Sequence, residues 1–280
     1  MNAHNKATWF MTFLKQLLMI TIALFMLLPL LWVAFNAFKL EPDINRYPPV
    51  FFPKQMTLEH FQYAFSSQNL FRFVGNSFMI ATGVVLFGCS VAALCAYAFS
   101  RYKFRGKGFC IAVVLFPMLI PGICNLIPIY SVYANFGLVN NYSALIALYI
   151  PGLLPLSIWV LRNYFDSVPI ALEEAAMIDG CTKLQVLRHI VLPVAAPGLL
   201  AIAIIGFVSA WNEFLLPLIF TTDTKMRPIT IGLYNLIGFA KVKYGSINAV
   251  AVTTLLPVLV IFLMFRKQFI TSMIEGAIKG

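Results

Sequence analysis

The chain has 280 residues, of which 61% are hydrophobic and 11% are charged, and its formal net charge is +10. Soluble domains have roughly a quarter of their residues charged, so this composition excludes an ordinary water-soluble domain and indicates a protein of the lipid bilayer. The basic residues lie beside apolar runs, which indicates orientation in the membrane and argues against a nucleic-acid partner. The five cysteines form no Cys-x-x-Cys pair, so neither a metal site nor a disulfide is expected.

Six apolar runs have the length of about 20 residues that a membrane helix needs. They cover residues 14–38, 73–99, 109–133, 142–161, 198–220 and 248–265. The first run has Lys6 before it and Lys15 at its start but is too long for a signal peptide, so we expect it to remain as an anchor. The predicted fold class is therefore all-α, a polytopic membrane protein with six transmembrane helices.

Charge in the short connections predicts the orientation of these helices. The connection between the second and third runs holds four basic residues and no acid, namely Arg101, Lys103, Arg105 and Lys107. By the positive-inside rule this connection and both termini are cytoplasmic. We expect a cytoplasmic N-terminus (1–13), a transmembrane domain (14–265) with a cytoplasmic loop at about 162–197, and a cytoplasmic tail (266–280).

Two longer segments fall on the opposite side of the membrane. Residues 40–72 are proline-rich and then predict a short helix capped by Thr57, whereas residues 221–247 are polar. They are either solvated loops that rest on the membrane or surfaces that receive a soluble protein.

The loop at 162–197 predicts two short helices joined by a sharp turn. Pro169 suits the first turn of a helix, and Gly180 suits its end because glycine adopts a left-handed conformation without strain. A second helix is expected from about Thr182 to His189, before Pro193 and Pro197. Acidic residues on the first helix favour a basic protein partner over an anionic membrane surface.

Polar residues within the apolar runs are candidates for a transport pathway. Glu213 is the one acid predicted deep in a span, and an unpaired charge in lipid costs several kcal/mol. With Asn212 it either lines the pathway or makes a structural hydrogen bond; Asn125 is a weaker candidate. Proline and glycine in the third and fourth runs indicate either pathway-lining breaks or packing kinks. Gly88, Ala92, Ala96 and Ser100 form a stripe typical of helix packing.

The spacing of several residues in this loop resembles a motif of a known protein family. Glu174-Ala175-Ala176 is followed by three residues, Gly180, nine residues, and Ile190-x-Leu192-Pro193. This pattern is similar to the EAA loop of ABC importer permeases. Segments 210–214, 227–233 and 268–280 resemble the carbohydrate-uptake branch, in particular the smaller permease of maltose-type systems. The resemblance assigns ATPase coupling to Glu173, Glu174, Ala175, Ala176, Asp179, Gly180, Ile190, Leu192 and Pro193.

The resemblance implies a set of partners. They are a second homologous permease, two copies of an ABC ATPase, a periplasmic or lipid-anchored sugar-binding protein, and the lipid of a bacterial inner membrane. It also implies that Glu174 and Gly180 hold the loop in the ATPase cleft and that the tail reaches toward the ATPase. No phosphate-binding motif surrounds Gly106-Lys107, so ATP and Mg²⁺ are expected on the ATPase, with no cofactor on this chain and no enzymatic activity of its own. The expected cargo is a di- or oligosaccharide, with polyols and glycerol phosphate left open.

Two other classes of membrane protein have sequence features that differ from those of this chain. An ion-coupled secondary transporter usually has paired repeats and several buried ionisable residues. A membrane enzyme needs a cluster of acids, histidines or cysteines at catalytic spacing. The sequence offers one buried acid, no convincing inverted repeat and no such cluster, so the secondary transporter is kept as the alternative.

Overall fold

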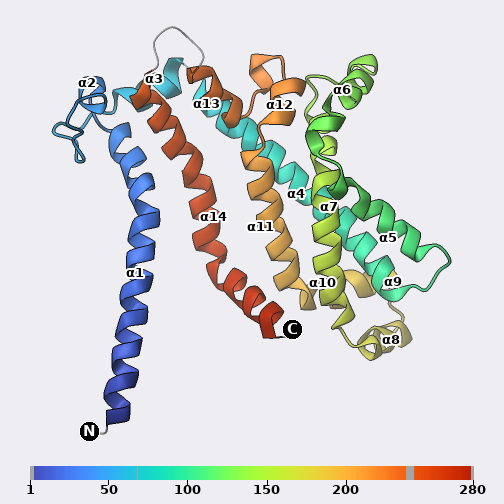
Figure 1. Cartoon of the computed structure of the whole chain (residues 1–280). Helices are drawn as coiled ribbons and strands as arrows, with labels where there is room; N and C mark the ends of the chain where they lie inside the picture. Colours follow the sequence, from blue (N-terminus) through green and yellow to red (C-terminus); the bar gives the residue numbers. More distant parts are fainter. Residues whose placement is uncertain (1–2, 68, 238–242, 279–280) are drawn as a thin grey trace. The chain divides into compact units, whose positions relative to one another are not determined.

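A computed structural model describes residues 3–67, 69–237 and 243–278, and all regular elements within them are helices (Figure 1). Four helices are long and apolar enough to cross a membrane singly. They are α1 (Ala3–Ala37), α4 (Leu70–Arg101), α7 (Tyr142–Asp166) and α14 (Tyr244–Ile278). Two bent pairs raise the number of candidate spans to six, so the predicted all-α polytopic fold is confirmed.

The third predicted span is a bent pair and not one straight helix. It contains α5 (Lys107–Leu115) and α6 (Leu126–Asn135), whose helical segments meet at 97°. The break lies at Ile120, which is extended, as residues that precede a proline tend to be. Pro121 cannot continue a helix because it lacks an N–H group. Most side chains around this break are exposed in the isolated chain.

The fifth predicted span, 198–220, is also interrupted. Its helix α11 (Ala196–Asn212) meets the preceding helical segment 183–194 at 82° and ends at Asn212. Glu213 is extended, and a separate helix α12 (Leu215–Phe220) follows it. The prediction of one continuous helix to Phe220 was therefore wrong, because hydrophobicity alone gave no signal of the break.

The chain divides into two compact units, Met1–Leu70 with Leu233–Leu255 and Phe71–Gly232 with Leu256–Gly280. In the first unit, α2 (Glu41–Ile44) and α3 (Glu59–Ser67) follow α1. The predicted cap is present, since the Thr57 hydroxyl accepts a hydrogen bond from the Glu59 N–H at 3.2 Å. The Glu41 carboxylate accepts from the Tyr244 and Gly245 N–H groups at 2.8 and 3.2 Å, which ties α2 to the start of α14.

A buried lysine organises the end of α1 in the same unit. Lys39 is 1% exposed, and its ammonium group donates to the Asn36 side chain at 2.7 Å and to the Val50 carbonyl at 2.5 Å. It also lies 4.4 Å from the centre of the Trp32 ring. Burial lowers the pKa of Lys39, and the Asp43 carboxylate opposes that shift. These contacts fold the segment after α1 back onto the helix end.

The core of the second unit is built on α4, α7 and α11. The predicted small-residue stripe packs inward, with Ala92 and Ala96 fully buried. A Cβ atom placed on Gly88 of α4 or on Gly206 of α11 would lie 2.9 Å from the Leu153 side chain of α7. Leu153 is therefore held between two glycines, which lets three helices approach closely.

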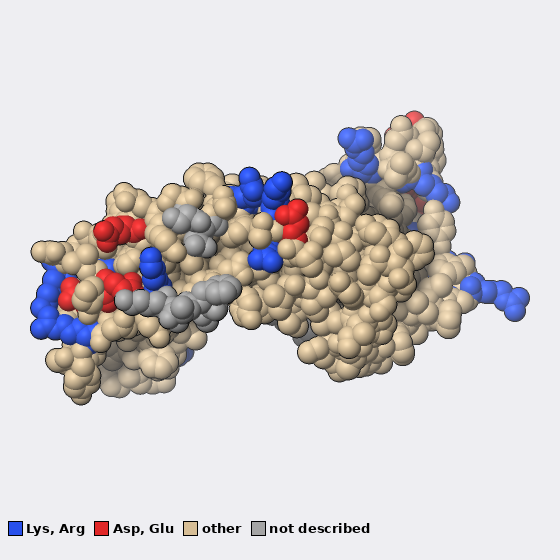
Figure 2. All heavy atoms as spheres, turned by 90° about the horizontal axis from the view of Figure 1, so that it is seen from above, with Lys and Arg blue, Asp and Glu red and all other residues tan. Residues whose placement is uncertain are grey.

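The polar segment 221–247 contains a helix that was not predicted. A 3₁₀ turn (Thr224–Met226) is followed by α13 (Ile229–Ile237), whose run of apolar residues is too short to stand out among charged neighbours. Residues 238–242 of this segment, and the side chains of the tail beyond Arg266, lie outside the described residues. Figure 2 shows that charged residues on the face seen from the top of Figure 1 gather in small groups separated by wide uncharged areas.

A close helix contact gives a test of this packing. Gly198 of α11 is buried against the Tyr164 ring of α7, and a Cβ atom there would clash with the ring. We expect Gly198→Ala to lower the free energy of unfolding by about 1–3 kcal/mol, because the Tyr164 ring, which packs against the core, would have to shift. Thermal unfolding in detergent measures the effect. Gly75→Ala is the control, since Gly75 has no atom within 4 Å of that position; equal melting of the two variants would contradict the packing.

Candidate functional site

The loop between α7 and α11 folds into a compact helical hairpin. Its first helix, α8 (Ile170–Ile178), begins after Pro169, which lies just before the first turn and not within it. At its end, the Gly180 N–H donates to the Met177 carbonyl at 3.1 Å and the Cys181 N–H to the Ala176 carbonyl at 3.0 Å. This is a Schellman motif, and it requires the left-handed φ of +91° at Gly180.

The second helix of the hairpin is longer than predicted. Thr182 and Gln185 form a capping box at the start of α9 (Lys183–Val186). The helix widens to a π turn (Leu187–Val191) and continues through α10 (Leu192–Val194). The π turn ends at Val191, two residues before Pro193, whose ring would crowd the carbonyl four residues earlier in a regular α-helix.

A buried ion pair ties this hairpin to α4. Arg101, the last residue of α4, lies 2.6 Å from the Glu173 carboxylate of α8 through both Nε and Nη2. Only 11% of the Arg101 side chain and 5% of the Glu173 side chain are exposed. The Tyr97 hydroxyl, one turn earlier on α4, donates to the other carboxylate oxygen at 2.9 Å. Both oxygens of Glu173 are thus satisfied within the chain.

Arg101 also binds the turn that leads into α8. Its Nη2 donates to the Phe165 and Val168 carbonyls at 2.7 and 3.0 Å, which satisfies carbonyl groups at the end of α7. The neighbouring Ser100 hydroxyl donates to Asp166 at 2.5 Å, and Asp166 pairs with Arg162 at 3.5 Å. The end of α4 therefore fixes both the end of α7 and the orientation of α8.

The predicted coupling residues divide into exposed and packed groups. The exposed group is Glu174, Ala175, Asp179, Gly180 and Pro193. The packed group is Glu173, Ala176, Ile190 and Leu192, of which the last three contact the core of the second unit. The expectation that Glu173 faces a partner together with Glu174 and Asp179 was therefore wrong, because Glu173 is buried against its own chain. Large apolar side chains such as Leu172 (50% exposed), Ile178 (86%) and Leu184 (67%) extend the exposed surface of the hairpin.

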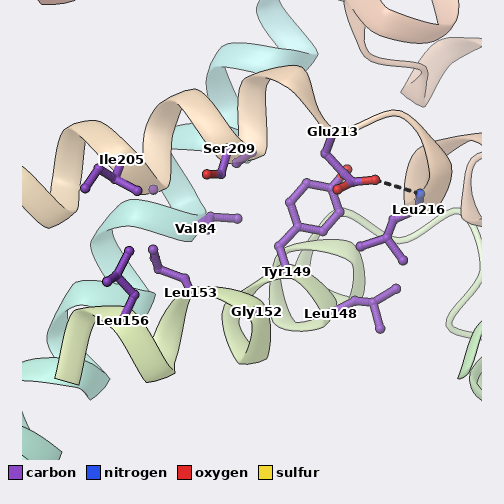
Figure 3. A pocket seen from close by; sticks show the side chains of 12 residues that line it. Val84, Leu148, Tyr149, Gly152, Leu153, Leu156, Ile205, Ser209, Glu213 and Leu216 are labelled. Carbon is purple, nitrogen blue, oxygen red and sulfur yellow. Dashed lines mark hydrogen bonds between the residues drawn. The ribbon is translucent and has the colours of Figure 1, made fainter. Parts of the chain in front are cut away.

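A second candidate site is a cavity of about 310 Å³ bounded by α4, α7, α11 and α12 (Figure 3). The Tyr149 ring and the Glu213 side chain lie next to each other there, and Ser209 adds a hydroxyl group. The other lining residues are mainly apolar. A cavity with an aromatic face and a few polar groups is typical of a small-molecule site.

Glu213 has a structural role as well as a place in the cavity. Its carboxylate accepts from the Leu215 and Leu216 N–H groups at 2.9 and 3.2 Å, which caps the start of α12. Its backbone carbonyl accepts from the Thr230 hydroxyl at 2.9 Å. Asn212 and Asn125 are both exposed and do not line this cavity, so the structure does not bring the three pathway candidates together.

Arg101, Tyr97 and Tyr149 have roles in the structure that no local sequence pattern predicts. The sequence around Arg101 predicts only a charge that orients the membrane helices, and nothing local links this residue to a glutamate 72 positions later. Tyr149 is an aromatic residue in an apolar run, with only the nearby Pro151-Gly152 as a signal. Among the described residues, no group of three or more His, Cys, Asp or Glu could hold a metal ion.

Comparison with known proteins gives consistent matches along the chain. Residues 84–269 match the family described as binding-protein-dependent transport system inner membrane component. The chain is 34% identical over 274 residues to the trehalose/maltose transport system permease protein MalG of Thermococcus litoralis, covering 95% of this chain and 98% of that protein. It is 32% identical over 254 residues to the sulfoquinovosyl glycerol transport system permease protein SmoH of Agrobacterium fabrum, covering 91% and 89%.

A solved structure has the same fold. A chain from a bacterial ABC transporter involved in the import of the acidic polysaccharide alginate aligns with a TM-score of 0.82 at 20% identity. The alignment covers 94% of this chain and 98% of that one.

The two adjacent glutamates of α8 give a direct test of the site geometry. Glu173→Gln leaves the Arg101 charge buried without its counter-charge, so we expect a loss of about 3–5 kcal/mol in the free energy of unfolding. Glu174→Gln, one position away and exposed, should change it by less than about 0.5 kcal/mol. Unfolding in detergent measures both.

A double substitution distinguishes the electrostatic contribution of the Arg101–Glu173 pair from the contribution of side-chain packing. The double variant Arg101→Met with Glu173→Met should recover part of the lost stability, because it removes both buried charges but leaves the Phe165 and Val168 carbonyls without their donor. Equal stability of the two single glutamine variants would contradict the buried pair.

Proposed function

Because the chain belongs to the family of inner membrane components of binding-protein-dependent transport systems, we propose that it is the permease subunit of an ATP-driven sugar importer. The observation that carries this proposal is the hairpin of α8 and α9, which is rigidly mounted on its own chain and leaves Glu174 and Asp179 exposed. The ion-coupled transporter is not favoured, since the family depends on a separate binding protein.

The exposed face of the hairpin has the chemistry of a docking surface. Ile178 and Leu184 present apolar area, and Glu174 and Asp179 add negative charge beside it. We infer that an ABC ATPase provides a groove with apolar pockets and basic side chains for this face. ATP and Mg²⁺ would bind to that ATPase, and no cofactor is proposed for this chain.

The remaining assembly follows from the same proposal. It consists of this chain, a second homologous permease, two ATPase copies and a periplasmic or lipid-anchored binding protein in a bacterial inner membrane. Residues 1–13 and 266–280 would lie in the cytoplasm, and 14–265 would form the transmembrane domain with its coupling loop at 162–197. The segments 40–72 and 221–247 would face the binding protein.

We propose that the cargo passes the cavity beside Glu213. An aromatic ring with an adjacent carboxylate and hydroxyl suits a sugar, which presents both C–H faces and O–H groups. Relatives are named for trehalose/maltose, diacetylchitobiose and galactooligosaccharides, which supports a di- or oligosaccharide. Asn212 and Asn125 stay proposals for other parts of the pathway.

Charge reversal on the hairpin tests the coupling role. In the complete transporter reconstituted in vesicles, Glu174→Lys should reduce ATP-driven sugar uptake roughly tenfold or more, as expected for a central interface residue. Gly180→Pro should do the same, because proline cannot adopt the left-handed φ of +91°. Uptake of radiolabelled maltose, trehalose and diacetylchitobiose is measured alongside ATP hydrolysis.

The control is Arg105→Gln, which changes one exposed charge in the loop between α4 and α5. It should leave uptake unchanged. Normal transport by both hairpin variants would overturn the coupling role, as would equal losses in the control.

Removal of the Tyr149 ring tests whether the sugar passes this cavity. Tyr149→Leu should lower uptake of the transported sugar about fivefold, because one aromatic contact contributes about 0.5–1.5 kcal/mol. Trp159→Leu removes a ring from the same helix on its exposed side and should have no effect. Binding of the ATPase should be the same in both variants, and a loss of uptake in Trp159→Leu alone would place the pathway elsewhere.

A further inference from the structure

One end of α4 holds the segment that leads from the 3₁₀ turn 224–226 into α13. The Asn76 amide donates to the Lys225 and Arg227 carbonyls at 2.8 and 3.0 Å, and the Ile229 N–H donates to the Ser77 hydroxyl at 2.8 Å. Asn76 and Ser77 are 8% and 3% exposed, so these bonds are shielded from water. This set is called the loop contact below.

The Tyr142 hydroxyl supports the loop contact from α7. It donates to the Asn76 side-chain oxygen at 2.9 Å, which fixes the direction in which the Asn76 amide points. Gly232 lies against the Phe73 ring, so the segment is held by packing as well as by hydrogen bonds. A displacement of residues 225–229 must therefore act on α4.

The other end of α4 holds the hairpin through the contacts already described. Arg101 binds Glu173, the Phe165 carbonyl and the Val168 carbonyl, and Tyr97 adds a second bond to Glu173. This set is called the hairpin contact. Both contacts lie within the second compact unit.

The helix between the two contacts is continuous. The rise from Ser77 to Arg101 is about 36 Å at 1.5 Å per residue. No proline interrupts α4, whereas α1, α7 and α14 each contain at least one. Its buried small residues pack against α7, which resists bending. A shift of one end along the helix axis therefore reaches the other end with little loss.

From this geometry we propose that α4 is the element that links the two ends of the transport cycle. Docking of the loaded binding protein at residues 225–229 would act on Asn76 and Ser77, and α4 would carry the displacement to Arg101, Glu173 and the ATPase-facing hairpin. Asn76, Ser77 and Arg101 are positioning residues in this scheme. The inference rests on the proposed function, because it needs an ATPase at the hairpin.

The test measures stimulation, the ratio of the ATPase rate with sugar-loaded binding protein to the rate without it. The complete transporter is used, with the sugar from the panel above that is taken up fastest. Asn76→Ala weakens the loop contact, and Arg101→Lys keeps the charge but loses the fork of hydrogen bonds. Each should reduce stimulation roughly fivefold, while the unstimulated rate stays within about twofold.

The decisive result is the double variant. Distant sites normally act independently, so separate roles would make the two reductions multiply. If α4 transmits one displacement from the loop contact to the hairpin contact, breaking either contact already interrupts it. The double variant should therefore show stimulation no lower than that of the more impaired single variant. Ser90→Ala is the control, since it removes a hydroxyl that bonds only within α4 on its exposed face.

Each outcome has one meaning. Full stimulation in both single variants, or a multiplied loss in the double variant, overturns the role of α4 and leaves the proposed function intact. A wild-type complex that binds no ATPase or shows no stimulation overturns the proposed function itself. If Asn76→Ala does not assemble, Ser77→Ala takes its place, because it removes a single hydrogen bond.

Discussion

The Arg101–Glu173 ion pair is the interaction on which the hairpin depends. Desolvation of two charges is costly, and the attraction between them offsets that cost only when the remaining hydrogen bonds are also made. Here the guanidinium meets two carbonyls and the carboxylate meets a tyrosine hydroxyl, so neither group is left unsatisfied. The guanidinium contacts one carboxylate oxygen through two nitrogens and also binds two carbonyl groups, so it fixes the orientation of α8 as well as its distance from α4.

The requirement that buried polar groups have hydrogen-bond partners also explains the breaks in the apolar spans. In a bilayer, a free backbone carbonyl or N–H needs a partner from the protein or from trapped water. At the break after Asn212, the Glu213 carboxylate supplies that partner for the start of α12, and Thr230 binds the carbonyl. The acid that looked like an isolated charge in lipid is therefore a helix cap at the edge of a cavity.

Much of the fold followed from local properties of the sequence. Apolar length predicted the spans, Gly180 predicted the end of α8, and the stripe through Ala92 and Ala96 predicted the packed face of α4. The ion pair between Arg101 and Glu173 could not be predicted from the sequence. Arg101 was already explained as a charge that orients the membrane helices, and Glu173 as an acid that binds a partner protein. The helix α13 was hidden among charged neighbours. The helical hairpin was therefore predicted at the right place along the chain, whereas its contacts with α4 were not predicted.

The position of Leu153 has a consequence for how such a protein can change. Its side chain lines the cavity and is held between Gly88 and Gly206, each on a different helix. A methyl group added at either glycine would lie 2.9 Å from the Leu153 side chain, so this wall of the cavity would have to rearrange. Under the proposed pathway, one substitution at either glycine would therefore change the space available to the cargo while the helices themselves keep their contacts elsewhere.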